Sequence, residues 1–468
     1  MVTFILDIGK TNIKGQVIDA SGALVWSRSH ANVVSAGAPY PHVDVEGIWC
    51  WLKSILHEAA GGFAIEAINV SAHGACALLL DEFGRLVLPA LDYEHSAIAA
   101  DTADYEAVRP DYSSTLSPSL GAGLNLGRQL WWLQKKFPEA FSSARWILLF
   151  PQYWVYRLTG IAASEVTSLG CHTDLWEPRV GRYSSLVKTL DIEEKLPPLV
   201  EATQSLGPVL PSLAGELGLP PQCMVYAGVH DSNASFARYL AAGLREPFTV
   251  ISTGTWVVAM MSGGSLDALQ EARDMLANVS VLGVPLACAR FMGGREFERL
   301  CQITGANPED PVSALEIQRI VDDQVYACPP FVAGSGPFQQ RVDEGVISGE
   351  VSSGTSLATL YLALVMDYQL DLLDARGRIL FGGVAQKNPI LCRLLAQLRP
   401  HQPVLAGDDT ASTIRGAWCL TRWQLPMPEA ITAFAPVAPA EVARLDEYRR
   451  QWRQKVVGGQ KQPVAEWQ

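Results

Sequence analysis

Hydrophobic and polar positions at the start of the chain follow the pattern of a β-hairpin. An apolar run at residues 2–6 leads into a polar, glycine-containing stretch at 7–15, and a second apolar strand is expected at 16–19. A turn at 20–22 then leads into a short strand at 23–27. This pattern predicts three consecutive antiparallel strands.

A helix and a further strand are expected next. Asp44 is placed to cap a helix that ends at Gly61 and Gly62, and residues 67–71 have the composition of a short buried strand. The helix carries apolar residues at helical spacing: Ile48, Leu52, Ile55, Leu56 and Ala59. Three strands, a helix and another strand are typical of the opening of a ribonuclease-H-like α/β domain.

A second strand-turn-strand unit of similar chemistry begins at residue 248. Residues 248–251 and 257–261 are expected to be strands around a polar turn at 252–256. Two such units suggest two related lobes that face one polyphosphate. Later in the second half, a strand is expected at 378–381 and a glycine-containing loop at 382–389.

The length of the chain favours two domains. A chain of 468 residues is too long for one ordinary core, and two domains of about 200–250 residues are the natural division. We place the crossing at 241–247, after a predicted helix. The expected parts are an N-terminal domain at 1–243, a C-terminal domain at 244–435 and a tail at 436–468.

The composition indicates which cellular compartment and which classes of partner to expect. The net charge is −12 and the basic residues gather only in a short tract at 449–455, which argues against nucleic acid as a partner. The nine cysteines include no C-x-x-C pair and predict a reducing compartment. No run approaches the roughly 20 apolar residues of a membrane span, and Asp7 and Lys10 interrupt the first apolar run too early for a signal peptide. A cytoplasmic protein without a membrane partner is expected.

The first polar turn has the chemistry of a phosphate site. Gly9 lets backbone amides approach an anion, Thr11 and a lysine supply further donors, and Asp7 can orient a hydrated divalent cation. Taken alone, the turn is better explained as an ordinary hairpin with a polar tip.

Asp231 is the candidate catalytic base. It follows a predicted strand at 224–229 and precedes a predicted helix, the position at which open α/β sheets carry their chemistry. A carboxylate there can accept the proton of a hydroxyl that attacks a γ-phosphate. Asp231 could instead cap the helix that is expected to begin near Ser232.

Other candidates carry weaker signals. Gly382 and Gly383 suit the sugar or phosphate of a nucleotide, or simply a tight turn, while Asn388 and Pro389 are placed to cap and to begin a helix. His73 follows a buried strand and could donate a hydrogen bond to a sugar hydroxyl, although a lone histidine is more often structural. Neither His73 nor the segment around His172 has metal-ligand spacing, so no metal site built by the protein alone is predicted.

Taken in order, these features resemble the FGGY family of carbohydrate kinases, in the sugar kinase, heat-shock ATPase and actin superfamily. The resemblance is collinear from Asp7 to about Trp418. Four segments carry it: 7–14, similar to D-x-G-x-T-x-x-K; 228–231, similar to G-x-H-D; the second phosphate loop at 252–255; and the adenosine segment at 382–389. Each segment is weak alone, and four in the right order are strong.

The resemblance implies two ribonuclease-H-like (actin-like ATPase) domains with an interdomain cleft that closes to exclude water. ATP would be bound mainly by the C-terminal domain and the sugar mainly by the N-terminal domain, with Asp231 as the base and Asp7 holding Mg²⁺ through water. The implied ATP-binding residues are Asp7, Gly9, Thr11, Asn12, Lys14, Thr253, Gly254, Thr255, Gly382, Gly383, Gln386 and Asn388. The implied sugar-binding residues are His73, Gly74, Glu94, His230 and Asp231.

Departures from the family pattern bear on the substrate. Xylulose and glycerol kinases usually carry W-x-D-x-R where this chain has 91–95, and the G-E-R-x-P segment lacks its Glu and Arg at 334–337. Segments 164–168 and 230–235 are nearer to the kinases for L-rhamnulose and L-fuculose, which phosphorylate the C1 hydroxyl of a ketose. A homodimer is expected only by family analogy.

Three alternatives remain open. The first is a kinase for another sugar or polyol, of the xylulose, ribulose or glycerol type. The second is an ATP-driven chaperone or actin-like filament protein, but a chaperone needs a peptide-binding domain and little chain follows residue 430. The third is a non-catalytic sugar sensor, against which Asp231 and the two phosphate loops count.

Overall fold

The computed structural model describes residues 1–341, 344–383, 388–407 and 411–458. By its contacts the chain divides into two compact units. The first comprises Met1–Arg245, Leu276–Leu286 and Ala411–Ala433, and the second comprises Glu246–Met275, Ala287–Thr410 and Phe434–Gln468. The domain bounds expected from the sequence stay predictions, because the first unit also draws on two segments beyond residue 245.

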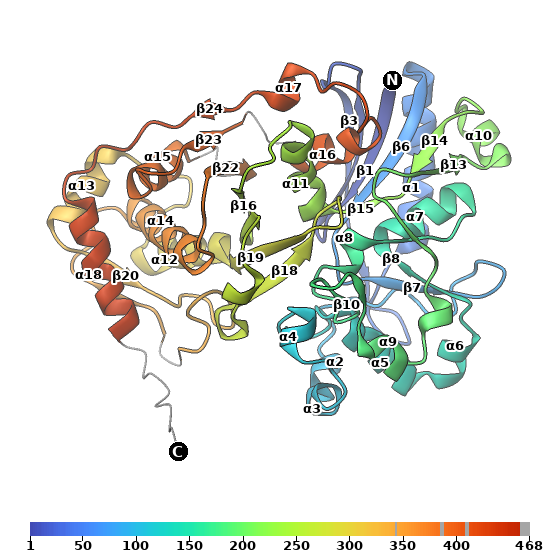
Figure 1. Ribbon diagram of the computed structural model, residues 1–468, viewed down its shortest axis with the longest axis horizontal. Helices are drawn as coiled ribbons and strands as arrows, with labels where there is room; N and C mark the ends of the chain where they lie inside the picture. The colour runs from blue at the N-terminus through green and yellow to red at the C-terminus, as the bar shows by residue number, and fades with distance from the viewer. Residues whose placement is uncertain (342–343, 384–387, 408–410, 459–468) are drawn as a thin grey trace. The chain divides into compact units, whose positions relative to one another are not determined.

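The first unit is built on a mixed β-sheet. Its strands are β1 (Val2–Ile8), β2 (Asn12–Ile18), β3 (Leu24–Ala31), β6 (Ile65–Ala72), β13 (Ser205–Pro208), β14 (Met224–Tyr226) and β15 (Val229–His230). They lie in the order β13-β14-β6-β1-β2-β3, with β15 beside β6 (Figure 1). The first three strands are antiparallel neighbours, and β6 runs parallel to β1.

Helices and small two-stranded sheets complete the first unit. The helices are α1 (Val45–Gly62), α2 (Ala97–Ala100), α3 (Thr102–Glu106), α4 (Tyr112–Thr115), α5 (Leu126–Lys136), α6 (Pro138–Ser143), α7 (Phe150–Thr159), α8 (Val166–Leu169), α9 (Ser185–Thr189), η1 (Glu193–Lys195), α10 (Pro211–Leu217), α11 (Asp231–Ala241), α16 (Ser412–Leu420) and α17 (Glu429–Thr432). The small sheets pair β4 (Val34–Ser35) with β5 (His42–Val43), β7 (Ala77–Leu80) with β8 (Trp146–Leu149), β9 (Ser164–Glu165) with β12 (Leu199–Val200), and β10 (Trp176–Glu177) with β11 (Arg182–Tyr183).

The sheet of the second unit repeats this strand order. Its strands are β16 (Phe248–Thr253), β17 (Val257–Ser262), β19 (Pro285–Phe291), β22 (Arg378–Gly383), β23 (Val404–Ala406) and β24 (Ala435–Pro436). The sheet also includes β18 (Met275–Val279), although the residues from Leu276 to Leu286 are grouped with the first unit. The strands lie in the order β18-β19-β17-β16-β22-β23-β24, where β17 is antiparallel and β22 parallel to β16. In both sheets three antiparallel strands precede the parallel ones, as the ribonuclease-H-like prediction requires.

The remaining elements of the second unit surround its sheet. They are η2 (Leu266–Ala268), η3 (Glu271–Arg273), α12 (Gly293–Thr304), α13 (Ala314–Asp322), β20 (Tyr326–Cys328), β21 (Val346–Ser348), α14 (Gly354–Leu372), α15 (Pro389–Leu398) and α18 (Leu445–Gly458). Helix α18 lies in the segment expected to be a tail, and its Trp452 is fully buried. In the described part of the chain, no helix has both the length and the apolar character needed to cross a bilayer.

Local sequence and cross-strand pairing explain where several of these elements begin and end. Asp44 accepts a hydrogen bond from the Gly47 amide at 2.9 Å, so the predicted cap of α1 is confirmed. The predicted second strand was too short, because cross-strand pairing extends β2 back to Asn12. The single strand expected at 224–229 was also wrong: Gly228 has a φ of +77°, which interrupts the strand and separates β14 from β15.

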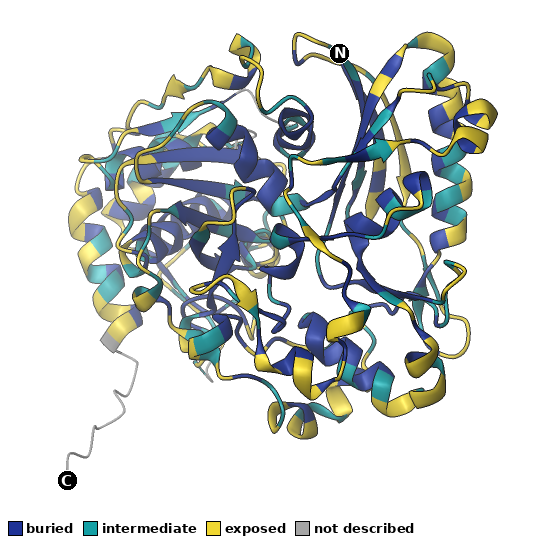
Figure 2. Cartoon of the chain, turned by 45° about the vertical axis from the view of Figure 1, so that its right-hand side comes forward, coloured by how far each residue is buried: buried dark blue, intermediate teal, exposed yellow. Residues whose placement is uncertain are grey.

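The core of each unit lies against its sheet. Figure 2 shows the central strands as buried and the outer helices as partly exposed. In the first unit, α16 packs closely on α11, and the two lie side by side in Figure 1. A Cβ atom at Gly416 would come within 1.6 Å of the Ala234 carbonyl oxygen, so the crossing requires a glycine there. Helix α16 therefore supports the helix that begins at Asp231.

Candidate active site

Asp7 lies on β1 at the edge of the first polar turn. Lys14 on β2 is its cross-strand partner. The pKa of Asp7 is raised to about 6 by burial and by the negative charge of Asp231, and Lys14 opposes this shift. A buried carboxylate whose ionisation is opposed by a neighbouring negative charge favours a cation beside it. The donor set therefore fits a hydrated Mg²⁺.

The turn after Asp7 is held in one conformation by its own backbone and by Asn32. The Gly9 amide donates to the Asn12 carbonyl at 2.9 Å, so this amide is used within the turn. The Asn32 side chain donates to the Gly9 carbonyl at 2.8 Å, and the Asn32 backbone amide donates to the Thr11 carbonyl at 2.8 Å. Thr11, Asn12 and Lys14 are exposed. The side chains predicted to meet phosphate thus point outward from a fixed turn.

Asp231 is the first residue of α11, directly after β15. Ser232 donates to its Oδ1 from the backbone amide at 2.5 Å and from the hydroxyl at 3.2 Å, while Oδ2 accepts no hydrogen bond from the described residues. His230 occupies the N-cap position, so Asp231 is not the capping residue. The side chain is 32% exposed, and burial raises its pKa. Asp231 is therefore an accessible carboxylate that is more basic than usual.

His230 is held by two buried residues that sequence reasoning did not assign to the site. Its backbone amide donates to Thr167 Oγ1 at 3.1 Å, and that hydroxyl donates to Glu165 Oε2 at 2.5 Å. Burial raises the pKa of Glu165 to about 7 and lowers that of His230 to about 4, so the imidazole is neutral at pH 7. The one available signal was the run of polar residues at 164–168.

Thr167→Val should destabilise the first unit. Valine has nearly the same shape but leaves the buried His230 amide without its partner, at a cost of about 1–3 kcal/mol. It also removes one of the two hydrogen bonds to Glu165 Oε2, which keeps the bond from the Ser168 amide at 3.3 Å. Urea unfolding measures this loss. Thr189→Val is the matched control, because Thr189 is exposed and its hydroxyl bonds only to the Ser185 carbonyl of its own helix among the described residues. Equal stability of the two variants would contradict the buried connection.

Glu165→Gln should make stability less dependent on pH. Because the folded pKa is about 7 and the ordinary value is 4.5, ionising Glu165 weakens the fold as the pH rises through this range. The penalty is absent below pH 4.5 and reaches up to about 3 kcal/mol above pH 7. Urea unfolding at pH 5 and pH 8 should show a larger gain, relative to wild type, at pH 8. The same difference at both pH values would contradict the raised pKa.

His73 is close to the turn but in a confined position. Its amide donates to the Ile8 carbonyl at 2.9 Å, and its Nδ1 lies 2.6 Å from the Gly74 carbonyl oxygen. Its Nε2 is buried and has no hydrogen-bond partner among the described residues. With Lys10 and Asn32 it lines a cavity of about 10 Å³, far too small for a sugar. The predicted bond from His73 to a sugar hydroxyl stays a prediction.

Gly74 and Glu94, the other two residues predicted to bind the sugar, have different neighbours. A Cβ atom at Gly74 would lie 3.2 Å from His230 Nε2, so Gly74 is beside the second histidine. Glu94 is more exposed, with Oε2 3.5 Å from the Lys10 ammonium, which also bonds to Asp92. Gly74 therefore lies beside His230, the neighbour of Asp231, whereas Glu94 lies beside Lys10 of the turn.

The second phosphate loop and the Gly-Gly segment meet in the second unit. Thr253 and Gly383 are register partners on β16 and β22, and Thr253 Oγ1 donates to the Gly382 carbonyl at 3.1 Å. Next to this loop, the Gly294 amide at the start of α12 donates to the Thr255 carbonyl at 3.2 Å. A Cβ atom at Gly294 would lie 2.5 Å from the Gly254 carbonyl oxygen. Sequence reasoning missed Gly294, although the pair Gly293-Gly294 was the available signal.

Asn388 caps α15, as predicted. Its side chain accepts from the Leu391 amide at 3.3 Å and donates to Thr359 Oγ1 at 2.8 Å, with Pro389 as the first helical residue. These bonds give Asn388 a structural role, and its predicted contact with a nucleotide stays a prediction. Gln386 lies outside the described residues.

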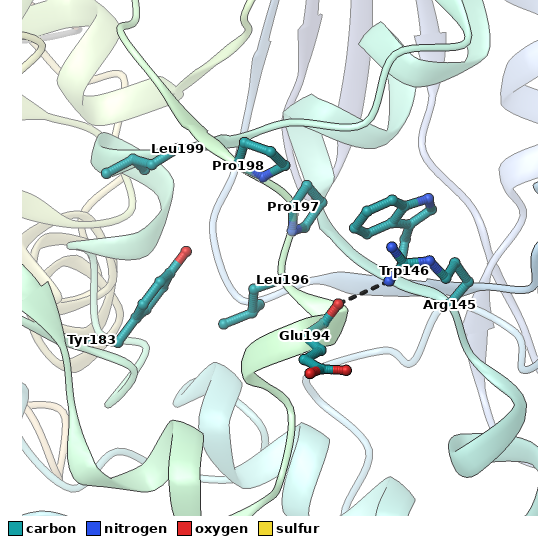
Figure 3. A pocket seen from close by; sticks show the side chains of 8 residues that line it. All are labelled: Arg145, Trp146, Tyr183, Glu194, Leu196, Pro197, Pro198 and Leu199. Atoms are coloured by element: carbon teal, nitrogen blue, oxygen red, sulfur yellow. Dashed lines mark hydrogen bonds between the residues drawn. The ribbon is translucent and has the colours of Figure 1, made fainter.

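A large surface hollow of the first unit contains none of the predicted site residues. It measures about 540 Å³ and is lined by Trp146, Tyr183, Pro197 and their neighbours (Figure 3). The Arg145 guanidinium lies 3.8 Å from the Trp146 ring centroid and donates to the Glu194 carbonyl at 2.9 Å. The wall of this hollow is mainly apolar, and neither of the two polar hairpin turns contributes to it.

Comparisons with known proteins agree with the resemblance seen in the sequence. The N-terminal domain model of the FGGY family of carbohydrate kinases matches residues 2–237, and the FGGY C-terminal domain model matches residues 245–429. A solved carbohydrate kinase from Novosphingobium aromaticivorans is 34% identical, with a TM-score of 0.88 over 98% of each chain. A xylulose kinase from Lactobacillus acidophilus, 17% identical with a TM-score of 0.79 over 98% of this chain and 99% of its own, shares the fold.

Curated relatives include the two types that the motifs favoured. An L-fuculokinase from Salmonella typhi is 26% identical over 279 residues, which is 57% of each chain. A rhamnulokinase from Enterococcus faecalis is 26% identical over 216 residues, or 44% of this chain and 42% of its own. The chain therefore spans about half the length of these curated relatives. With its two family domains and its two ribonuclease-H-like sheets, the chain belongs to the FGGY family of carbohydrate kinases.

Proposed function

We propose that this protein transfers the γ-phosphoryl group of ATP to a hydroxyl of a ketose sugar. The observation that carries the proposal is Asp231, a partly exposed carboxylate at the end of β15 whose pKa is raised. It lies close enough to Asp7 for its charge to raise the pKa of that residue as well. A basic carboxylate beside a candidate cation site is what phosphoryl transfer to an alcohol needs.

Asp231 acts as the general base in this proposal. Its carboxylate accepts the proton of the sugar hydroxyl while that oxygen bonds to the γ-phosphorus, and the bond to the ADP oxygen breaks. The neutral His230 beside it adds no positive charge that would lower its basicity. Ser232 holds Oδ1 and so fixes the orientation of the carboxylate, which leaves Oδ2 to accept the proton.

Asp7 would hold hydrated Mg²⁺, which when bound offsets the negative charge of the phosphates. Thr11, Asn12 and Lys14 of the first unit are donors for phosphate oxygens on their fixed turn. In the second unit, the loop at 253–255 and the adjoining Gly382 and Gly383 supply further amides and hydroxyls. Their pairing across β16 and β22 supports a common role in binding ATP.

The proposed acceptor is the C1 hydroxyl of L-rhamnulose or L-fuculose. The names of the L-fuculokinase and rhamnulokinase relatives support this choice, while relatives named as L-xylulose and xylulose kinases keep other ketoses open. The test is ADP release with ATP and Mg²⁺ against ketoses, pentitols and glycerol. A large stimulation by one deoxyketohexose, with phosphate on O1 by NMR, is expected. Strong activity only with a pentulose or a polyol would overturn the substrate assignment and keep the kinase.

Two finer expectations belong with this proposal. A cytoplasmic kinase would have access to ATP and to a reducing environment that suits nine cysteines. A homodimer follows only from family analogy, and sedimentation of the purified protein would test it.

A further inference from the structure

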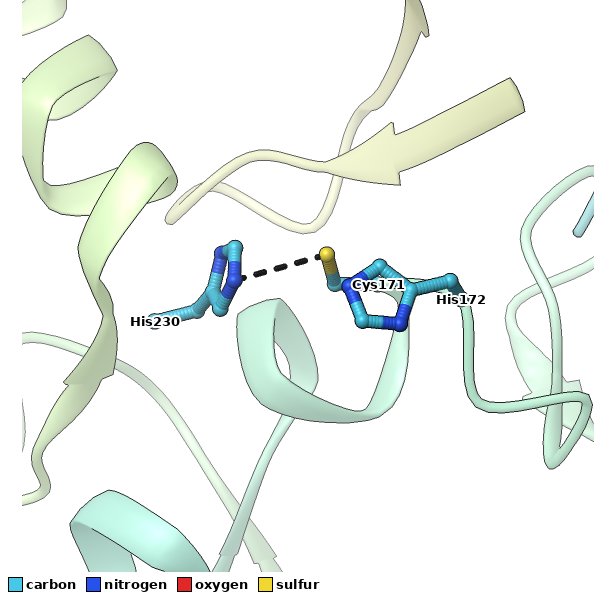
Figure 4. A group of neighbouring side chains, drawn as sticks. All are labelled: Cys171, His172 and His230. Atoms are coloured by element: carbon cyan, nitrogen blue, oxygen red, sulfur yellow. Dashed lines mark hydrogen bonds between the residues drawn. The ribbon is translucent and has the colours of Figure 1, made fainter. Parts of the chain in front are cut away.

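Two histidines and a cysteine gather beside the proposed base in the first unit. Their donor atoms, from Cys171, His172 and His230, all lie within 4.8 Å of one another (Figure 4). Cys171 Sγ is 3.5 Å from His230 Nε2. Cys171 and His230 are buried and His172 is half-buried, so the group is largely shielded from water.

The ring of His172 is oriented for metal binding by its backbone and by a carbonyl. Its Nδ1 lies 2.7 Å from the Leu124 carbonyl oxygen, and because a carbonyl only accepts, Nδ1 carries the proton. The lone pair of the neutral ring is then on Nε2. The residue has a φ of +41°, in the left-handed region that is costly for a histidine. Such an outer carbonyl is the usual support of a metal-binding histidine.

His230 has a comparable support in Asn233. The buried Asn233 amide lies 3.1 Å from His230 Nδ1, and its oxygen has no other hydrogen-bond partner in the described part of the chain. Because the nitrogen and oxygen of an amide are assigned from the hydrogen-bond network, the ring can donate from Nδ1 to that oxygen. The lone pair of His230 is then on Nε2, which faces Cys171.

Space for an ion is provided by Gly74. A Cβ atom there would lie 3.2 Å from His230 Nε2 and 3.3 Å from His172 Cε1, so any larger residue would fill the gap between the two rings. Tetrahedral zinc with nitrogen and sulfur ligands places them about 3.3–3.9 Å apart. The Cys171–His230 distance already fits, and the widest pair must close by about 1 Å.

We propose that Cys171, His172 and His230 form a binding site for Zn²⁺ that inhibits the protein. A thiolate and two imidazoles are the ligand set that zinc prefers, and the Cys171 proton is released on binding. Asp231 Oδ1 lies 3.4 Å from His230 Nε2, so a zinc ion there attracts the proposed base and occupies the space beside it. The inhibition rests on the proposed function, whereas the binding does not.

Binding is measured on the full chain without ATP or sugar. The chain is first freed of metal with EDTA, and Zn²⁺ is then titrated in competition with a chromophoric chelator. One equivalent should bind tightly. Co²⁺ as a probe should give tetrahedral d–d bands and a thiolate-to-cobalt charge-transfer band. In Cys171→Ser this last band should disappear and zinc affinity should fall at least tenfold.

Two further variants keep the test interpretable. His172→Gln should also weaken zinc binding, and this variant replaces Cys171→Ser as the test if Cys171→Ser folds poorly. Cys50→Ser is the matched control, since Cys50 is an exposed thiol on α1 outside the cluster. An unchanged cobalt spectrum in Cys171→Ser, or no stoichiometric zinc binding by wild type, would overturn the site.

Activity separates the site from the function. Zinc should inhibit wild type reversibly, with EDTA restoring the rate, and should inhibit Cys171→Ser at least tenfold less strongly. Equal inhibition of both proteins would overturn the inhibitory role. A protein that binds zinc but phosphorylates no sugar would contradict the proposed function and leave the binding site supported.

Discussion

Asp231→Asn should lower kcat by about 10²–10⁴-fold, the range that a positioned base contributes. The amide has nearly the same size and can still accept the hydrogen bond from Ser232, but it cannot take up the proton of the attacking hydroxyl. The apparent affinities for ATP and sugar should change little, because the lost contact acts in the transition state. Steady-state kinetics with the best sugar of the panel measures both effects.

Asp44→Asn provides the control for this substitution. Asp44 also stands at the start of a helix, where asparagine caps equally well, and it lies outside the candidate site. Its kcat should remain that of wild type. If Asp231→Asn kept a near wild-type rate, Asp231 would not be the base.

Gly254→Val should raise the apparent KM for ATP by about 10- to 100-fold, which corresponds to about 1.4–2.7 kcal/mol. The loop itself tolerates a side chain: the nearest atom to an added Cβ is the Trp256 carbonyl oxygen at 3.8 Å. The expected loss therefore comes from the volume where phosphate oxygens should lie. Nucleotide titration of the variant measures binding independently of turnover.

Gly121→Val is the matched control for the loop. Gly121 is an exposed turn residue of the first unit, and an added Cβ meets no atom within 4 Å among the described residues. Its affinity for ATP should be unchanged. Unaltered nucleotide binding by Gly254→Val would refute the assignment of the second phosphate loop.

Features set by neighbouring residues could be predicted from the sequence. The α1 cap at Asp44, the α15 cap at Asn388 and the two polar hairpin turns depend on short segments whose composition decides their conformation. The three antiparallel strands that open the first sheet also followed from the succession of these elements. The exact strand ends did not, because pairing across the sheet, rather than local composition, extends β2 back to Asn12.

Features that depend on distant contacts were missed. The connection from Glu165 through Thr167 to His230 joins residues more than sixty positions apart, and only the fold brings them together. The return of α16 to the first unit depends on a glycine, Gly416, that packs against Ala234. The group of Cys171, His172 and His230 likewise joins two adjacent residues to a distant histidine whose spacing matches no metal motif.

The most direct test of phosphoryl transfer follows the γ-phosphate itself. The protein is incubated with Mg²⁺, ATP labelled in the γ-phosphate and each ketose, pentitol or glycerol in turn, and the label is traced by chromatography. We expect the label on one ketose, with L-rhamnulose and L-fuculose as the leading candidates, and little of it as inorganic phosphate. Label found only in inorganic phosphate, or retained in bound ATP whichever sugar or polyol is present, would contradict a carbohydrate kinase.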